Sequence, residues 1–153
     1  MSISDIYNFI QIDGLTATAG QPSADQFEEI ADSGYSAVIN LAPDGLDTSL
    51  PEEAELLHRL GMEYYHIPVA WSDPQLGELS RFESLMASLS GSPTFIHCQA
   101  NFRVTVFFAL YATSHLGWSD EQANALIDRI WTSRPGFEMD DTWKNFVAAA
   151  RSR

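Results

Sequence analysis

The chain has 153 residues, of which 45% are apolar, and a formal net charge of −13. This length is typical of one domain, which we expect to span residues 1–153, and the apolar content is sufficient for a buried core. The strong negative charge repels nucleic acids and anionic membranes at long range. Neither is therefore an expected partner.

The numbers of cysteine and histidine residues limit which metals, cofactors and cellular compartments are expected. The chain has one cysteine, Cys98, and four scattered histidines without metal-ligand spacing, so we predict neither a metal nor a cofactor. A single cysteine forms no internal disulfide, which favours a reducing compartment such as the cytoplasm. No segment has the length and apolarity of a membrane span, and residues 1–13 do not resemble a signal peptide.

Short apolar runs alternate with helical patterns along the chain. We expect strands at residues 14–19, 36–41, 62–69 and 94–97. The expected helices cover residues 24–33, 51–60, 76–89, 103–116, 119–132 and a last segment after Asp140. Ser23 with Gln26 and Ser119 with Gln122 form capping boxes, and Pro51 suits the first position of a helix.

This alternation predicts an α/β fold with a central, mainly parallel sheet of four to five strands and helices on both faces. Ligands of such folds bind beyond the carboxyl ends of the strands. Two loops leave strands at that edge, residues 70–75 and 98–102. We therefore expect the functional site between these two loops.

The second of these loops carries the strongest chemical signal. Cys98 ends the apolar run 93–97, and Arg103 follows five positions later at the start of a long apolar helix. The helix N-terminus, the arginine and successive loop amides all favour an anion, whether a thiolate or a bound oxyanion. The pattern indicates nucleophilic catalysis with electrostatic stabilisation of the developing charge.

His97-Cys98 followed by Arg103 after a short strand resembles the signature of cysteine-dependent phosphatases of the tyrosine and dual-specificity superfamily. Three further segments are similar to a compact bacterial branch of dual-specificity-like phosphatases: residues 20–23, 37–41 and 65–69. The resemblance spans roughly residues 14–135. It implies a phosphomonoester hydrolase that acts on a phosphorylated small molecule or a phosphoprotein.

The resemblance also implies a role for each matching residue. Cys98 corresponds to the nucleophile that forms a phosphocysteine, Arg103 to the arginine that binds phosphoryl oxygens, and Asp73 to the general acid. His97 corresponds to the histidine that supports the loop. The phosphate-binding segment corresponds to Gln99, Ala100, Asn101, Phe102 and Arg103.

The sequence departs from the family pattern at two places. Four residues rather than five separate Cys98 from Arg103, with Asn101 at the usual glycine, and Asn is the next best residue at positive φ. Val104 stands where the family has Ser or Thr, and Thr105 follows as the nearest hydroxyl. We expect a tighter loop with one amide fewer, which favours oxyanion binding over efficient turnover.

Two other functions remain open at this point. A non-catalytic phosphate- or phosphoprotein-binding module would use the same loop without turnover, and a rhodanese-like sulfurtransferase would carry a persulfide on Cys98. Asp73 also suits a simple turn before Pro74. Arg134 is expected at the surface, and the alternative is a second contact to a bound anion. Trp71 is expected either to form a lid over the site or to pack in the core.

Overall fold

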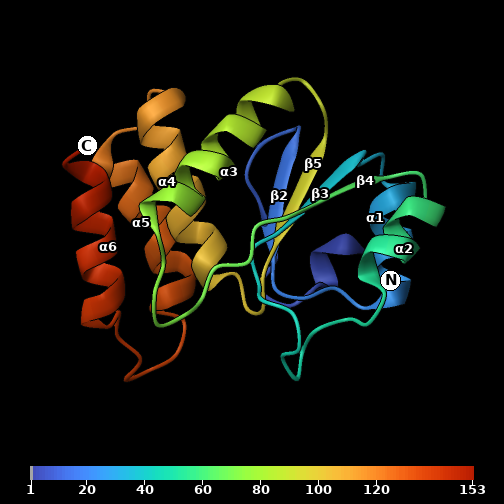
Figure 1. Ribbon diagram of the computed structural model, residues 1–153, viewed down its shortest axis with the longest axis horizontal. Helices are drawn as coiled ribbons and strands as arrows, with labels where there is room; N and C mark the ends of the chain where they lie inside the picture. Colours follow the sequence, from blue (N-terminus) through green and yellow to red (C-terminus); the bar gives the residue numbers. More distant parts are fainter. Residues whose placement is uncertain (1) are drawn as a thin grey trace.

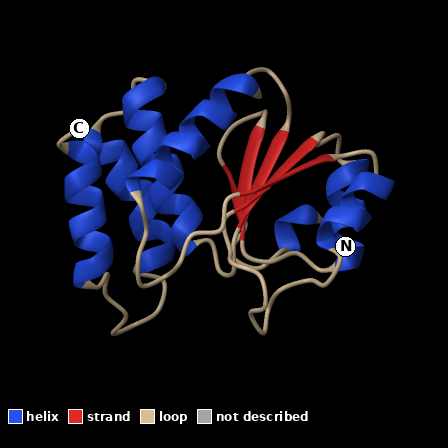
Figure 2. Ribbon diagram, viewed as in Figure 1, coloured by secondary structure: helices blue, strands red, loops and turns tan. Residues whose placement is uncertain are grey.

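The computed structural model describes residues 2–153 and contains a five-stranded sheet in the order β1-β2-β5-β3-β4. Figure 2 shows the strands in red between two groups of helices. The strands are β1 (Ile10–Gln11), β2 (Thr16–Ala19), β3 (Ala37–Asn40), β4 (Glu63–His66) and β5 (Thr94–His97). Four of them are parallel, and β1 pairs antiparallel with β2 at one edge. The mainly parallel α/β fold predicted from the sequence is confirmed.

Helices cover both faces of the sheet (Figure 1). One face carries the short 3-10 helix η1 (Ile3–Asp5), α1 (Ala24–Asp32) and α2 (Glu53–Arg59). The other carries α3 (Leu76–Ser88), α4 (Phe102–His115), α5 (Asp120–Trp131) and α6 (Asp141–Arg151). Within residues 2–153, no helix has the length and apolarity needed to cross a membrane.

Two apolar cores result, one on each side of the sheet. The smaller core contains Phe27, Val38 and Phe95 beneath α1 and α2. The larger core surrounds α4, whose residues from Phe102 to Ala112 are all buried. Burial on nearly every side explains why the sequence of this helix is apolar all round. It also fixes the start of α4, and with it the loop that leaves β5.

Most helix boundaries follow the signals in the sequence. Both predicted capping boxes form, at Ser23 and at Ser119, and Asp140 caps α6. Two expectations were wrong in detail. Pro51 lies in a turn before α2 because Glu52, at φ 61°, is the residue that precedes the helix. The strand β1 was not predicted, since two residues are too few to show an alternating pattern.

Candidate active site

The candidate site begins where β5 ends and α4 starts. His97 pairs with Ala19 of β2 on one side and Asn40 of β3 on the other, so Cys98 leaves the centre of the sheet at its carboxyl edge. Four residues then reverse the chain into α4. Asn101 precedes the helix in the left-handed region, at φ 70° and ψ 9°, as its predicted place at positive φ requires.

Side-chain bonds and a close backbone approach hold this loop in place. The Asn101 amide group donates to the Asn8 carbonyl at 2.8 Å and to Thr18 Oγ1 at 2.9 Å. Gly20 lies against the loop, because a Cβ there would come within 2.8 Å of the Gln99 carbonyl oxygen. The absence of a side chain at this position therefore lets β2 approach the loop.

The backbone amides of the loop are available to an anion. Within residues 2–153, the N–H groups of Gln99, Ala100, Phe102 and Arg103 donate no hydrogen bond to the protein. The last two belong to the first turn of α4, where N–H groups have no partner within the helix and the helix dipole is positive. The loop therefore offers converging donors of the kind that bind phosphate at helix N-termini.

Arg103 adds a positive charge beside this loop. Its Nε donates to the Val69 carbonyl at 2.8 Å, and its Cζ lies 5.3 Å from the centre of the Trp71 ring. Burial lowers the pKa of Arg103, and the neighbouring Cys98 side chain opposes this shift. An arginine remains charged under such conditions. The backbone bond and the aromatic contact orient its guanidinium group next to the cysteine.

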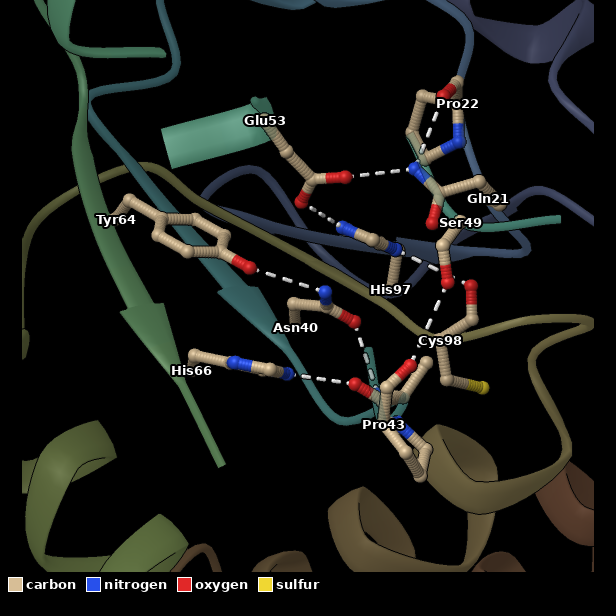
Figure 3. A network of polar contacts seen from close by, with 11 residues as sticks. Gln21, Pro22, Asn40, Pro43, Ser49, Glu53, Tyr64, His66, His97 and Cys98 are labelled. Atoms are coloured by element: carbon tan, nitrogen blue, oxygen red, sulfur yellow. Dashed lines mark hydrogen bonds and ion pairs between the residues drawn. The ribbon is translucent and has the colours of Figure 1, made fainter. Parts of the chain in front are cut away.

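Cys98 is fully buried at the start of the loop. In Figure 3 its sulfur points away from His97. Its chemical neighbours are the Arg103 guanidinium and the first turn of α4. A thiolate at this position would have opposite charge next to it, which is the setting that makes a cysteine a nucleophile.

A cavity of about 800 Å³ opens over the loop. Gln99, Ala100, Phe102 and Arg103 form part of its lining, and Arg134 is a second arginine in it. Within the described residues, no Asp or Glu lines this cavity. We call it the arginine cavity. Its volume lies in the range of sites for small organic molecules.

A buried carboxylate supports the loop from behind, and it was not among the residues predicted for the site. Glu53 on α2 accepts hydrogen bonds from His97 Nε2 and from Gln21 Nε2, both at 2.7 Å (Figure 3). Because a carboxylate only accepts, Nε2 of His97 carries its proton. The other ring nitrogen lies 3.1 Å from the Cys98 carbonyl oxygen. Glu53 thus fixes the ring that precedes Cys98 and a side chain that lines the arginine cavity.

Asp73 and Thr105 lie apart from the cavity in this structure. The Asp73 carboxylate is exposed and accepts from Gln75 Nε2 at 2.6 Å. Its loop is anchored two residues earlier, where the Trp71 carbonyl accepts from Trp143 Nε1 at 2.9 Å. The Thr105 hydroxyl is buried and donates to the Phe102 carbonyl at 3.0 Å. The general-acid role suggested for Asp73 and the supporting role of the Thr105 hydroxyl therefore stay predictions.

The four tryptophans divide between core and site. Trp131 and Trp143 are buried in the larger core, and Trp118 is partly buried against it. Trp71 belongs to both, because it stacks on Trp131 at 5.4 Å between ring centres and also lines the arginine cavity. Its side chain is a fixed wall of the site.

A second cavity of about 540 Å³ lies on the other side of the loop between β3 and α2. We call it the acidic cavity, because Asp44, Glu52 and Glu53 line it together with Tyr64 and His66. Burial raises the pKa of Tyr64 to about 12, although a hydrogen bond from Asn40 opposes the shift. Within residues 2–153, no group of three or more His, Cys, Asp or Glu side chains is placed to hold a metal ion.

Known proteins resemble this chain in both sequence and fold. Residues 9–115 match the family described as the phosphatase-like domain of beta-lactamase hydrolase-like protein. The chain belongs to this family. Together with the fold, this membership places it in the superfamily of cysteine-dependent phosphatases, as the sequence predicted.

Curated relatives are longer than this chain. The beta-lactamase hydrolase-like proteins of two Xylella fastidiosa strains, Temecula1 and 9a5c, are each 31% identical over 104 residues, which is 66% of this chain and 24% of the relative. The chain thus spans about a quarter of the length of the curated relatives it matches.

Solved structures share the whole fold. A DUF442 protein from Shewanella putrefaciens CN-32 has a TM-score of 0.86 and 25% identity, and the match covers 98% of this chain and 95% of that chain. Tk-PTP in its active form has a TM-score of 0.77 and 21% identity, with 95% and 97% of the two chains covered. The dual-specificity phosphatase-like architecture predicted from the sequence is therefore confirmed.

Proposed function

We propose that this protein hydrolyses phosphomonoesters through a phosphocysteine intermediate on Cys98. One observation carries the proposal: amides that have no hydrogen-bond partner within residues 2–153 and the Arg103 guanidinium converge beside this cysteine at the N-terminus of α4. Membership of a phosphatase-like family supports it. The substrate class is a phosphorylated small molecule or a phosphoprotein, since the arginine cavity is open to either.

In the first step, Arg103 and the loop amides would bind the phosphoryl oxygens and place phosphorus against the cysteine sulfur. The thiolate then displaces the ester oxygen, while the same donors stabilise the charge that builds up on the equatorial oxygens. In the second step, water attacks the phosphocysteine, the P–S bond breaks to return the Cys98 thiolate, and inorganic phosphate is released. The Asp73 carboxylate left by the first step would take the proton of the attacking water. The donors are fixed by the protein before the substrate arrives, so little reorganisation is needed during the reaction.

Asp73 is our proposed general acid for the leaving oxygen. Its loop follows Val69, whose carbonyl holds Arg103, and contains Trp71, which lines the arginine cavity. To act, the carboxylate would exchange its bond to Gln75 for a place at the mouth of the cavity. General acids of this kind contribute about 10²–10⁴-fold.

A second candidate function is phosphate binding without turnover. The observation that favours it is the carboxylate-free lining of the arginine cavity among the described residues, together with the outward position of Asp73. A site that has anion-binding donors but no general acid would bind a phosphorylated ligand and hydrolyse it slowly.

Hydrolysis of p-nitrophenyl phosphate separates the two candidates. We expect wild type to turn over this substrate and Cys98→Ser to lose the activity, because serine is a far weaker nucleophile in this setting. Both proteins should bind orthovanadate or phosphate, as measured by thermal stabilisation. Wild-type activity no higher than that of Cys98→Ser, with phosphate still bound, would identify a binding module.

A further inference from the structure

We propose that the substrate carries a second anionic group, held by Arg134 at the mouth of the arginine cavity while Arg103 holds the phosphoryl group. This inference rests on the proposed function, because it names the substrate class of the same site: a small phosphomonoester with a carboxylate or other anion at its far end.

The arginine cavity differs in charge from the rest of the chain. The sequence has 21 acidic and 8 basic residues. Two arginines nevertheless line this cavity, and no carboxylate within residues 2–153 does. The overall charge repels an anion at long range. A ligand with two negative groups would find here two cations without a competing carboxylate in the wall.

The two arginines have separate tasks. Arg103 is buried, bonded to the Val69 carbonyl and next to Cys98, so its free guanidinium nitrogens serve the phosphoryl group. Arg134 comes from the loop after α5 and donates from one terminal nitrogen to the Tyr7 hydroxyl at 3.1 Å. Within residues 2–153, no Asp or Glu forms an ion pair with either arginine.

Tyr7 makes the position of Arg134 specific. Its ring lies against Gly20, where a Cβ would come within 3.0 Å of it, and Gly20 in turn lies against the Cys98–Arg103 loop. The hydroxyl of Tyr7 accepts from Arg134 without neutralising its charge. Arg134 is thus oriented by a neutral partner in the same cavity wall, and its remaining donors are free for a ligand.

Aromatic side chains line the same cavity as the two arginines. Phe102 packs against both of the others, with its ring centre 5.0 Å from that of Phe137 and 6.1 Å from that of Trp71. Such a wall fits a carbon skeleton rather than a second hydrated ion. The combination describes an organic molecule with a phosphate at one end and an anion at the other.

A pair of isosteric aryl phosphates tests the charge directly. Wild type should show a higher kcat/KM for 4-(carboxymethyl)phenyl phosphate than for the neutral 4-(carbamoylmethyl)phenyl phosphate, by about two- to tenfold. The preference should weaken between low and high salt, because screening acts on the charged end alone. Aryl phosphates that carry the carboxylate on a longer chain would show which distance between phosphate and carboxylate fits best.

The matched variants are Arg134→Gln and Arg129→Gln. Both remove an exposed arginine, but Arg129 lies on α5 outside the arginine cavity. We expect Arg134→Gln to bring the ratio of the two kcat/KM values close to one and Arg129→Gln to leave it unchanged. An unaltered ratio in Arg134→Gln, or an equal loss in both variants, would overturn the inference.

Binding of the methylene phosphonate analogues of the same pair, measured calorimetrically on wild type and both variants, separates this inference from the proposed function. Hydrolysis of both esters without any preference, and equal affinity for both phosphonates, would overturn the second-anion site and leave the phosphatase proposal standing. Tighter binding of the carboxylate through Arg134 without any hydrolysis would support the second-anion site while the phosphatase proposal fails.

Discussion

The arginine cavity and the acidic cavity lie on opposite sides of one short loop and have opposite character. Both are lined by Gln21 and by Leu46, Ser49 and Leu50 of that loop. One contains two arginines and no carboxylate from the described residues, whereas the other contains three carboxylates. In a chain with a net charge of −13, the proposed anion site therefore depends on local segregation of charge and not on the overall field.

Glu53 links the groups on the two sides of the loop. It lines the acidic cavity, yet its carboxylate accepts hydrogen bonds from His97, which precedes Cys98, and from Gln21, which also lines the arginine cavity. The negative charge is thus used to orient groups behind the cysteine loop, while the lining of the arginine cavity contains no carboxylate from the described residues. The following substitutions test this separation of charge, beginning with the one that should reduce activity most.

Among these substitutions, Arg103→Lys in the arginine cavity should reduce activity most. The substitution keeps a positive charge but removes the planar fork and the Nε bond to Val69. We expect kcat/KM for p-nitrophenyl phosphate to fall by about 10²–10³-fold, the usual cost of losing an oriented donor to the transition state. A loss below threefold would mean that charge alone suffices and that the orientation of Arg103 is irrelevant.

Asp73→Asn asks whether a carboxylate enters the arginine cavity during the reaction. We expect a loss of about 10²-fold with phenyl phosphate and a much smaller loss with p-nitrophenyl phosphate, whose leaving group needs no proton. Asp47→Asn is the matched control, since Asp47 is an exposed carboxylate in the loop between the two cavities. Equal losses for both substrates, or a larger effect at Asp47, would remove Asp73 from the mechanism.

Glu53→Gln tests the connection between the cavities. The amide keeps the shape of the side chain but can accept only through one oxygen, so the bond to His97 or to Gln21 is lost. We expect the free energy of unfolding to fall by about 1–3 kcal/mol and kcat to fall about tenfold. The neighbouring exposed Glu52→Gln should change neither, as followed by urea denaturation and steady-state kinetics.

Tyr64→Phe concerns the acidic cavity alone, and its effect appears in stability. The pKa of Tyr64 is raised to about 12 in the folded protein, above the usual value of 10.0. The unfolded chain therefore loses this proton first, and wild type loses stability as the pH rises from about 10 to about 12. The difference in unfolding free energy between wild type and Tyr64→Phe should be constant below pH 10 and should shift in favour of the variant above it.

The sequence predicted those parts of the site that depend on residues close together in the chain. The strand, cysteine, loop and helix of residues 94–116 are local, and each signal lies within a few residues of the next, so the loop and the positive φ of Asn101 were predictable. Contacts between residues far apart in the chain were not predictable. Arg103 meets the carbonyl of Val69 and Glu53 meets His97, and these partners lie 34 and 44 residues apart.

A weak signal for Glu53 does exist. It is four residues before Leu57, which is buried in the smaller core, so both side chains lie on the inner face of α2. A carboxylate on such a face needs a hydrogen-bonding partner. The same reasoning gives no partner for Arg134, because its place in the arginine cavity depends on how the loop after α5 folds back toward Tyr7.

The proposed reaction requires the sulfur of Cys98 to attack phosphorus. Acid quenching of wild type during turnover of p-nitrophenyl phosphate, followed by peptide mass spectrometry, would detect the resulting phosphocysteine. We predict one phosphoryl group on the peptide that contains Cys98 and none on the corresponding peptide of Cys98→Ser. A phosphoryl group on another residue, or undiminished turnover in Cys98→Ser, would contradict the account.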